Sequence, residues 1–332
     1  MLTFWRQRIF ASLIPMFCLM VWLVVAPLAA ISGPLEDGLK AYRARDFAQA
    51  EKLLRPLAEK GNPVAQFKMG LLTNFGLLGK PDAEAAGKWF EKASQGLPKA
   101  AKQGDAEAAF SLGVMYENGT HFNRSTEEAL IWYRQAATKG HPEAQFNMCV
   151  ATTSGQGIKK DAKEGLNWCR KAALAGIAPA QATLADAYMN GIGTSRDPVE
   201  AVKWYQKAAD QGDANAMTTL GVAYFEGEGV AQDTTKAMAL WDKATNLGSA
   251  YAAFMLGLAH YKGRGVPKDL EKAKLHWRQA ADMGNAVAQY NLGAMLIKGS
   301  EAERKEGVRW LQTSAEQGYP PAKEAIKKLE KK

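Results

Sequence analysis

Most of the chain alternates two helical patterns of apolar and polar positions. In residues 214–227 the apolar or small positions are Ala216, Leu220, Gly221 and Tyr224. They recur at i, i+4, i+5 and i+8, which places them on one face of a helix. This first pattern predicts an amphipathic helix whose buried stripe includes a glycine.

The second pattern follows the first after a short loop and carries an aromatic stripe. Asp197 can cap the free N–H groups of a helix, and Pro198 suits its first position. Trp204 and Tyr205 then lie on the apolar face, and Gly212 ends the segment. Each unit of the chain is therefore predicted to be a pair of helices.

These units recur with a fixed period. Six tryptophans step by 33 to 37 residues, namely Trp132, Trp168, Trp204, Trp241, Trp277 and Trp310. The terminating glycines step by 36 residues, namely Gly140, Gly176, Gly212, Gly248 and Gly284. A period of this size is typical of a solenoid, in which neighbouring units bury one continuous core. The period predicts one elongated all-α unit, although the length of 332 residues alone would suggest two domains.

The order of residues in each unit resembles the Sel-one-like repeat, a relative of the tetratricopeptide repeat. The resemblance is fullest at Ala216, Leu220, Gly221, Tyr224, Gly227, Gly229, Val230, Asp233, Ala237, Trp241 and Ala244. It covers residues 63–319 in seven units, here called repeats one to seven. It implies a right-handed α-solenoid of antiparallel helix pairs. It also implies an adaptor for protein partners, because similar repeats serve as envelope regulators and as assembly factors for exported polysaccharide.

The segments that flank the seven repeats are predicted to close the solenoid. Residues 33–62 resemble a degenerate tetratricopeptide-type unit, which we interpret as the N-terminal cap. Residues 320–332 are predicted to form a basic C-terminal helix or tail. Repeat one is longer than the others, with 43 residues between Gly70 and Gly113. Because Pro98 lies in this surplus, we expect a kink or protruding loop near residues 94–104.

The first 32 residues have the pattern of a secretory signal. Arg6 and Arg8 precede an apolar run from residue 9 to residue 25, and small residues follow. The run also approaches the roughly 20 residues that span a bilayer, so residues 1–32 are either a cleaved signal peptide or an N-terminal membrane anchor. Either alternative predicts export, with the solenoid in the periplasm, free or anchored to the inner membrane.

Charge and motifs narrow the classes of function. The net charge of +8 falls to +6 without residues 1–32, and it is spread along the helices rather than gathered into a basic stripe. We therefore expect no nucleic-acid partner. The Gly-x-Gly pairs lack the third glycine and the preceding strand of a dinucleotide site. The four histidines form no H-E-x-x-H motif, and S-x-x-K and G-x-S-x-G are absent. We expect no metal, no cofactor, no catalytic residue and no small-molecule substrate.

The first hypothesis for function is thus an exported, non-enzymatic adaptor. Two alternatives remain open. A membrane-tethered spacer would use the first residues as an anchor and the solenoid as a rod. An enzyme that binds or hydrolyses β-lactams would follow the cysteine-rich branch of the family, although this chain lacks the paired cysteines that the branch carries in every repeat.

Two cysteines, Cys149 and Cys169, lie in repeat three. By the family pattern they occupy slots that hold a glycine and a tyrosine in the core. Because the helices of a pair are antiparallel, the two thiols could face each other. A disulfide, two buried free thiols and a reactive thiol are the three alternatives.

The remaining candidate is a binding groove lined by the first helices. By analogy with tetratricopeptide grooves, its lining lies one, two or five places from the shared leucine. One row comprises Asn147, Thr183, Thr219 and Asn291, with Asp186, Phe225 and Tyr261 beside it. Short polar side chains of this kind can hold the backbone of an extended peptide, but an ordinary solvated face would look the same.

Overall fold

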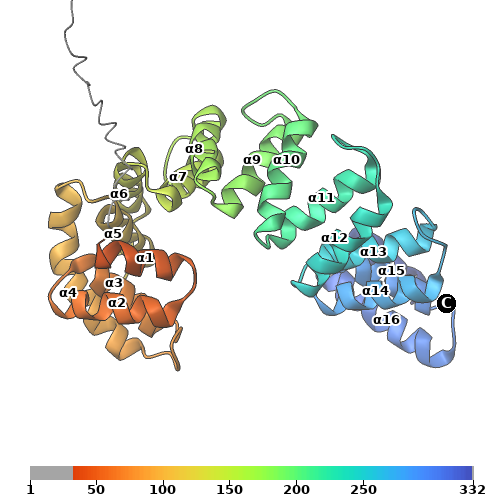
Figure 1. Ribbon diagram of the computed structural model, residues 1–332. Helices are drawn as coiled ribbons and strands as arrows, with labels where there is room; N and C mark the ends of the chain where they lie inside the picture. Colours follow the sequence, from red (N-terminus) through yellow and green to blue (C-terminus); the bar gives the residue numbers. More distant parts are fainter. Residues whose placement is uncertain (1–32, 331–332) are drawn as a thin grey trace, which may run out of the picture.

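The computed structural model describes residues 33–330, which form seventeen α-helices paired one after another along a curved solenoid (Figure 1). The first helices of the pairs are α1 (Pro34–Arg43), α3 (Pro63–Asn74), α5 (Ala106–Asn118), α7 (Pro142–Ser154), α9 (Ala178–Asn190), α11 (Ala214–Glu226), α13 (Ala250–Lys262) and α15 (Ala286–Leu296). The second helices are α2 (Phe47–Glu59), α4 (Ala83–Lys102), α6 (Thr126–Thr138), α8 (Ala162–Leu174), α10 (Pro198–Asp210), α12 (Thr234–Asn246), α14 (Leu270–Asp282) and α16 (Glu301–Glu316). A last helix, α17 (Pro320–Leu329), packs on α16. The predicted α-solenoid of helix pairs is confirmed.

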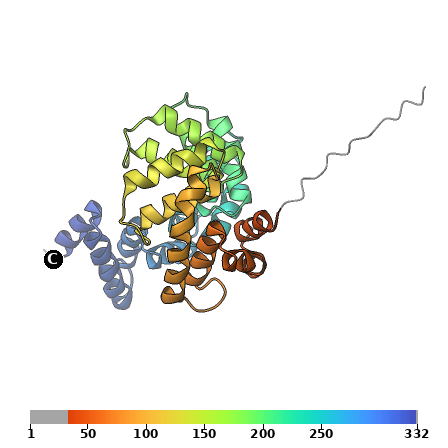
Figure 2. The same ribbon diagram turned by 90° about the vertical axis from the view of Figure 1, so that its left-hand side faces the viewer.

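The pairs follow a superhelical path. In Figure 1 they form an arch whose two ends point to the same side, and the turned view in Figure 2 shows these ends offset from each other. Helices chiefly contact their neighbours in chain order. The fold is therefore built from local contacts, as expected of repeats in which each unit touches only the next.

One close contact recurs inside the helix pairs. A Cβ atom at Gly221 of α11 would lie 2.4 Å from Nε1 of Trp241 on α12. Trp241 is fully buried, and its Nε1 donates a hydrogen bond to the carbonyl of Thr218 at 3.0 Å. The same spacing of twenty residues joins Gly70 to Phe90, Gly113 to Tyr133 and Gly257 to Trp277. We call this contact the glycine–ring contact; it lets the two helices of a pair approach closely.

The Gly-x-Gly pairs shape the loops between the helices of a pair. Gly227 ends α11 with φ +75°, a conformation that other residues rarely adopt. A Cβ atom at Gly229 would lie 2.2 Å from the carbonyl oxygen of Pro198, at the start of the second helix of the preceding repeat. The loop therefore docks against the neighbouring repeat only because glycine stands there.

Buried glutamines tie each repeat to the one before it. The side-chain amide of Gln145 donates to the carbonyl of Ala137 at 3.2 Å, near the end of α6. Equivalent bonds join Gln66 to Ala58, Gln181 to Ala173 and Gln289 to Ala281. Each of these carbonyls also accepts from the N–H of the terminating glycine, as Ala137 does from Gly140, so the glutamine fills the second acceptor position of a carbonyl at the helix end.

The protruding loop expected near Pro98 is absent, and the proline does not interrupt the helix. Helix α4 runs without interruption through twenty residues, with Pro98 inside it. The surplus of repeat one lengthens this helix and adds Leu97 and Ala101 to its fully buried side. Burial of that added face offsets the hydrogen bond that proline cannot donate to Ser94.

The glycine–ring contact leads to a first prediction. Gly221→Ala should lower the free energy of unfolding by about 1–3 kcal/mol, because the new methyl group must displace the buried Trp241 ring. The matched control is Gly87→Ala on α4, where a Cβ atom meets nothing within 4 Å. That change should stabilise the helix by about 0.5–1 kcal/mol. Urea unfolding followed by circular dichroism measures both, and equal stability of the two variants would contradict the contact's importance.

Candidate functional site

The residues predicted to line a groove all lie on first helices. They are Asn147 on α7, Thr183 and Asp186 on α9, Thr219 and Phe225 on α11, Tyr261 on α13, and Asn291 on α15. They do not line one continuous cleft. Tyr261 and Asn291 share one cavity, and Asn147 lines another.

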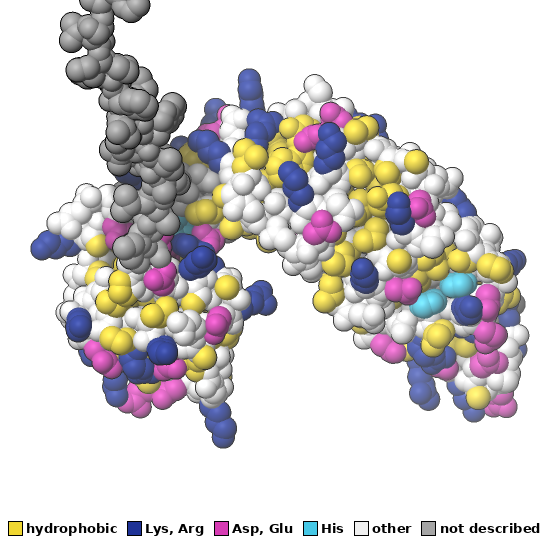
Figure 3. All heavy atoms as spheres, viewed as in Figure 1, with side chains coloured by type: hydrophobic (Ala, Val, Ile, Leu, Met, Phe, Trp, Pro, Cys, Tyr) yellow, Lys and Arg dark blue, Asp and Glu magenta, His cyan; other side chains and the backbone are white. Residues whose placement is uncertain are grey.

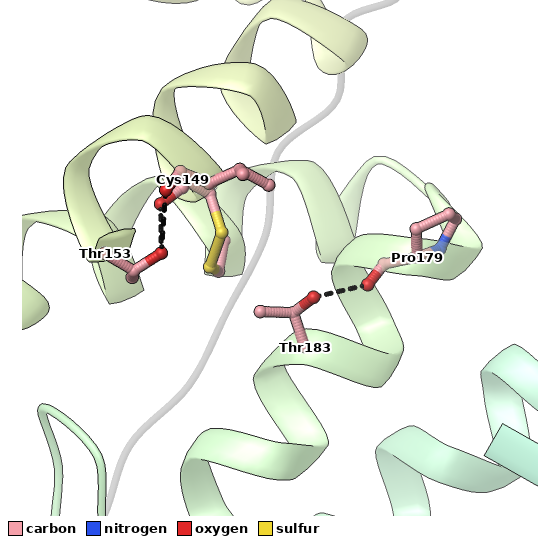
Figure 4. The surroundings of a disulfide bond; sticks show 6 residues. Cys149, Thr153, Pro179 and Thr183 are labelled. Carbon is pink, nitrogen blue, oxygen red and sulfur yellow. Dashed lines mark hydrogen bonds between the residues drawn. A yellow bond between two sulfur atoms is a disulfide. The ribbon is translucent and has the colours of Figure 1, made fainter. Parts of the chain in front are cut away.

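The two threonines of the row use their hydroxyl protons within their own helices. Thr183 donates to the carbonyl of Pro179 at 2.8 Å (Figure 4), and Thr219 donates to that of Asn215 at 3.1 Å. Both side chains are half-buried. Only their acceptor lone pairs remain for a ligand, which limits them to partners that offer N–H groups.

Two residues beside the row make contacts within the protein: Asp186 is exposed but hydrogen-bonded, and Phe225 is buried. Asp186 accepts a hydrogen bond from the hydroxyl of Tyr205; burial raises the pKa of Asp186, and this bond offsets only part of the rise. Phe225 as a groove residue is wrong, because it is only 5% exposed. It packs on Trp241, with ring centroids 5.2 Å apart, and Arg264 covers its other side. Phe225 is therefore enclosed between the ring of Trp241 and the guanidinium of Arg264.

At the C-terminal end, a cavity of about 530 Å³ opens between α13 and α15. Its lining includes Leu258, Tyr261, Trp277, Tyr290, Asn291 and Met295. Tyr261 is 43% exposed, and its ring lies 5.1 Å from that of buried Trp277. We call this the C-terminal cavity; its floor is aromatic and aliphatic.

At the other end, a cavity of about 730 Å³ is bounded by the first helices α1, α3, α5 and α7 and by the start of α9. Its lining includes Tyr42, Phe67, Lys68, Phe110, Ile177 and Pro179. Residues this far apart in the chain meet because the superhelix curves toward its first helices. We call this the N-terminal cavity, and the first helices therefore form the concave face.

A buried ionic network lies against the N-terminal cavity. Glu107 on α5 accepts from Lys68 Nζ at 2.7 Å and from Arg43 Nη2 at 2.6 Å. Its third partner is Nε2 of His141 at 3.0 Å. Nδ1 of His141 accepts from the backbone N–H of Ala144 at 3.3 Å, so Nε2 carries the proton and donates it.

Electrostatics hold Glu107 ionised. Its burial raises the pKa, but Lys68 and His141 lower it by more, so the pKa of Glu107 lies well below its usual range. Arg43 also pairs with Glu143 at 3.2 Å, so two acidic groups balance two basic ones. The network joins residues of α1, α3 and α5 to Glu143 of α7 and to its N-cap, His141.

Sequence reasoning missed this network, although a signal was present. Lys68 stands two residues before Gly70. Asn147 holds the same position in repeat three, two residues before Cys149. Lys68 is therefore a charged member of the predicted polar row. His141 likewise stands where an Asp, Asn or Ser caps five of the seven other first helices. Neither substitution names its partner, because Glu107 lies in a different repeat from Lys68 and 34 residues before His141.

Repeat three replaces the glycine–ring contact with a disulfide. Cys149 on α7 and Cys169 on α8 are bonded, with Cα atoms 5.0 Å apart and a sequence separation of 20 (Figure 4). Both cysteines are fully buried. Of the three alternatives for these thiols, the structure holds the bridge, and it occupies the place of the glycine and ring of other repeats.

The described residues 33–330 contain neither a metal-binding cluster nor a membrane-spanning helix. In residues 33–330, no group of three or more His, Cys, Asp and Glu side chains is arranged to hold a metal ion. On the face shown in Figure 3, basic and acidic side chains are interspersed among exposed hydrophobic ones. Within the same residues, no helix is long and apolar enough to cross a membrane.

Comparison with protein families identifies the class of this chain. The Sel1 repeat model matches eight segments, namely residues 35–62, 63–96, 106–141, 142–177, 178–213, 214–249, 250–285 and 286–319. The chain belongs to the Sel1 repeat family. The family model thus counts residues 35–62, interpreted above as a degenerate cap, as a repeat. Proteins built from these repeats generally mediate protein–protein interactions, and the scaffold is typically non-catalytic.

Two solved structures show the same architecture. A protective antigen of uropathogenic Escherichia coli with an SLR fold is 31% identical, with a TM-score of 0.64. That match covers 87% of this chain but only 62% of the antigen. A Sel1 repeat protein from Oxalobacter formigenes is 30% identical, also with a TM-score of 0.64, and the match covers 88% and 86% of the two chains. No match was found among curated proteins.

The ionic network leads to a second prediction. Glu107→Gln should lower the free energy of unfolding by about 3–5 kcal/mol near pH 7, since it leaves the buried ammonium of Lys68 without its carboxylate. The folded-state pKa of Glu107 lies below its unfolded value of about 4.3, so its contribution is full above that value and is lost at lower pH. The difference between wild type and variant should therefore shrink as the pH falls from 5 to 2.

The control for this change is Glu301→Gln, which breaks the exposed pair with Lys305. An exposed pair contributes about 0–1 kcal/mol. Urea unfolding at each pH gives the free energy of unfolding of the wild type and of both variants. A stability difference for Glu107→Gln that stays constant down to pH 2 would contradict the ionised, paired state of Glu107.

The disulfide leads to a third prediction. Reduction by dithiothreitol should lower the free energy of unfolding by about 2–4 kcal/mol, because the loop it closes becomes free in the unfolded chain. The double variant Cys149→Ala and Cys169→Ala should lose a similar amount and no longer respond to the reductant. Cys149→Gly with Cys169→Tyr rebuilds the contact of repeat two and should regain part of the loss. Equal stability of the two double variants would show that the ring does not replace the bridge.

Proposed function

We propose that this protein is an exported scaffold that holds a segment of another protein on the concave face formed by its first helices. The observation that carries this proposal is where the two largest cavities described lie. Both open on the first helices, one at each end of the arch. Trp277 of a glycine–ring contact lines the C-terminal cavity, but other lining residues, such as Lys68 and Asn291, stand at a position that differs from repeat to repeat.

The depth and chemistry of these cavities suit protein segments. Their volumes fall within the roughly 300–1,000 Å³ of ligand-binding pockets, and their walls are mainly aromatic and aliphatic with a few polar groups. Aromatic anchors in well-packed pockets provide most of the binding energy at protein interfaces. A rigid arch also loses little entropy on binding, which favours recognition of a flexible segment.

Two features support export. The disulfide between Cys149 and Cys169 is of a kind that persists in oxidising compartments such as the periplasm. The signal-like residues 1–32 lie outside the described residues, and their sequence supports the same location. We therefore place the scaffold in the bacterial envelope, where partners would be other exported proteins.

The test of this proposal is photo-crosslinking in intact cells. A photoreactive amino acid at Asn147 or Thr219, both on first helices, should capture a partner protein. The same group at Asp210 or Lys243, exposed on second helices, should not. The mass of the purified chain reports processing, since a start near Ile31 or Gly33 indicates a cleaved signal. Capture only from the second helices would contradict a concave binding face.

A further inference from the structure

The C-terminal cavity differs from the N-terminal cavity in the balance of its charges. Lys268, in the loop after α13, and Lys298, just after α15, both line it and are exposed. Among residues 33–330, neither ammonium group has a carboxylate within 4 Å. No acidic residue lines the cavity. In the N-terminal cavity, by contrast, Glu107 neutralises Lys68.

The position of Lys268 sharpens this difference. Lys268 stands directly before Asp269, the aspartate that caps α14. Arg196 holds the same position in repeat four, directly before Asp197. Arg196 pairs with Glu228 of the next repeat. For Lys268 the place of Glu228 lies in repeat seven, where Ser300 stands; Ser300 carries no charge and caps α16, so Lys268 lacks the equivalent partner.

The two lysines lie at one edge of the cavity. Lys268 follows the C-terminal end of α13, and Lys298 follows that of α15. First helices run parallel to one another, so these two ends lie on the same side of the solenoid. The aromatic floor, formed by Tyr261, Trp277 and Tyr290, lies beside this cationic edge. Asn291 adds a side-chain amide that can donate and accept hydrogen bonds.

We propose that the C-terminal cavity binds an extended partner segment in which a large apolar side chain stands within two residues of an aspartate or glutamate. The apolar side chain fills the aromatic floor, and the carboxylate pairs with Lys268 and Lys298. A partner carboxylate supplies the charge that the chain itself does not provide there. This inference rests on the proposed scaffold function and names the chemistry of its partner.

The experiment is selection of a random dodecapeptide library, displayed on phage, against the folded protein. Enriched peptides should share Phe, Tyr, Trp or Leu with an Asp or Glu at most two residues away. Synthetic peptides with fluorescein and an amidated C-terminus then give affinities by fluorescence polarisation. Replacing the acidic residue by its amide should weaken binding at least about tenfold, because a charge-assisted bond is lost.

Charge reversal in the protein gives the matched comparison. Lys268→Glu with Lys298→Glu should weaken binding of the selected peptides at least about tenfold and should gain binding of peptides with Lys at the acidic position. The control is Lys159→Glu with Lys160→Glu, which places the same charges on exposed residues of repeat three, where Lys160 fills the slot of Lys268. That variant should bind as wild type does. Circular dichroism establishes that all three proteins are folded.

Three outcomes would overturn the inference. They are the absence of enriched peptides, a consensus without a carboxylate, and equal binding by wild type and the Lys268→Glu, Lys298→Glu variant. The scaffold proposal stands or falls separately. If Asn147 and Thr219 still crosslink a partner in cells, the concave face binds a protein by another part of its surface. If they capture nothing, the scaffold function itself fails.

Discussion

The structure depends on the close approach of two helices at the glycine–ring contact. Gly221 has no side chain where the ring of Trp241 packs, and the same spacing of twenty residues returns in other repeats. With the pair held closely, the glycine loop can dock on the preceding repeat and the buried glutamines can reach its last carbonyls. Repeat three meets the same constraint differently, since the bond between Cys149 and Cys169 joins the helices where the glycine and ring would stand.

Much of the fold was predictable because its rules are local. Capping residues, terminating glycines and the 36-residue period predict the helix pairs without knowledge of any long-range contact. The errors arose where packing overrides a local rule. Pro98 was expected to break a helix, but the added face of α4 is buried well enough to keep it continuous. Phe225 was expected to face a groove, but Trp241 and Arg264, which lies 39 residues further along the chain, cover it from two sides.

The candidate site was less predictable because it is made of residues from separate repeats. Tyr261 and Asn291 were nominated from their slots and do line one cavity, but their cationic neighbours carry no signal in a single repeat. Arg43 reaches Glu107, 64 residues away, because the superhelix brings α1 toward α5. Such contacts depend on the small rotation between successive pairs, which the consensus residues do not reveal. The two ends of the concave face consequently differ in charge. Acidic partners neutralise the basic residues at the N-terminal cavity, whereas Lys268 and Lys298 at the C-terminal cavity have no carboxylate partner among the described residues.

The most direct test of this account is the unfolding of a chain that lacks one complete repeat, residues 214–249. Asp213 would then precede Ala250 and keep its place as a cap, and every remaining glycine–ring contact would be intact. The account predicts a folded, shorter solenoid with unchanged ellipticity per residue and one cooperative transition at lower urea concentration. Loss of helical signal well beyond the deleted residues would contradict it, because it would show that contacts across the whole arch, rather than those between neighbours, hold the structure together.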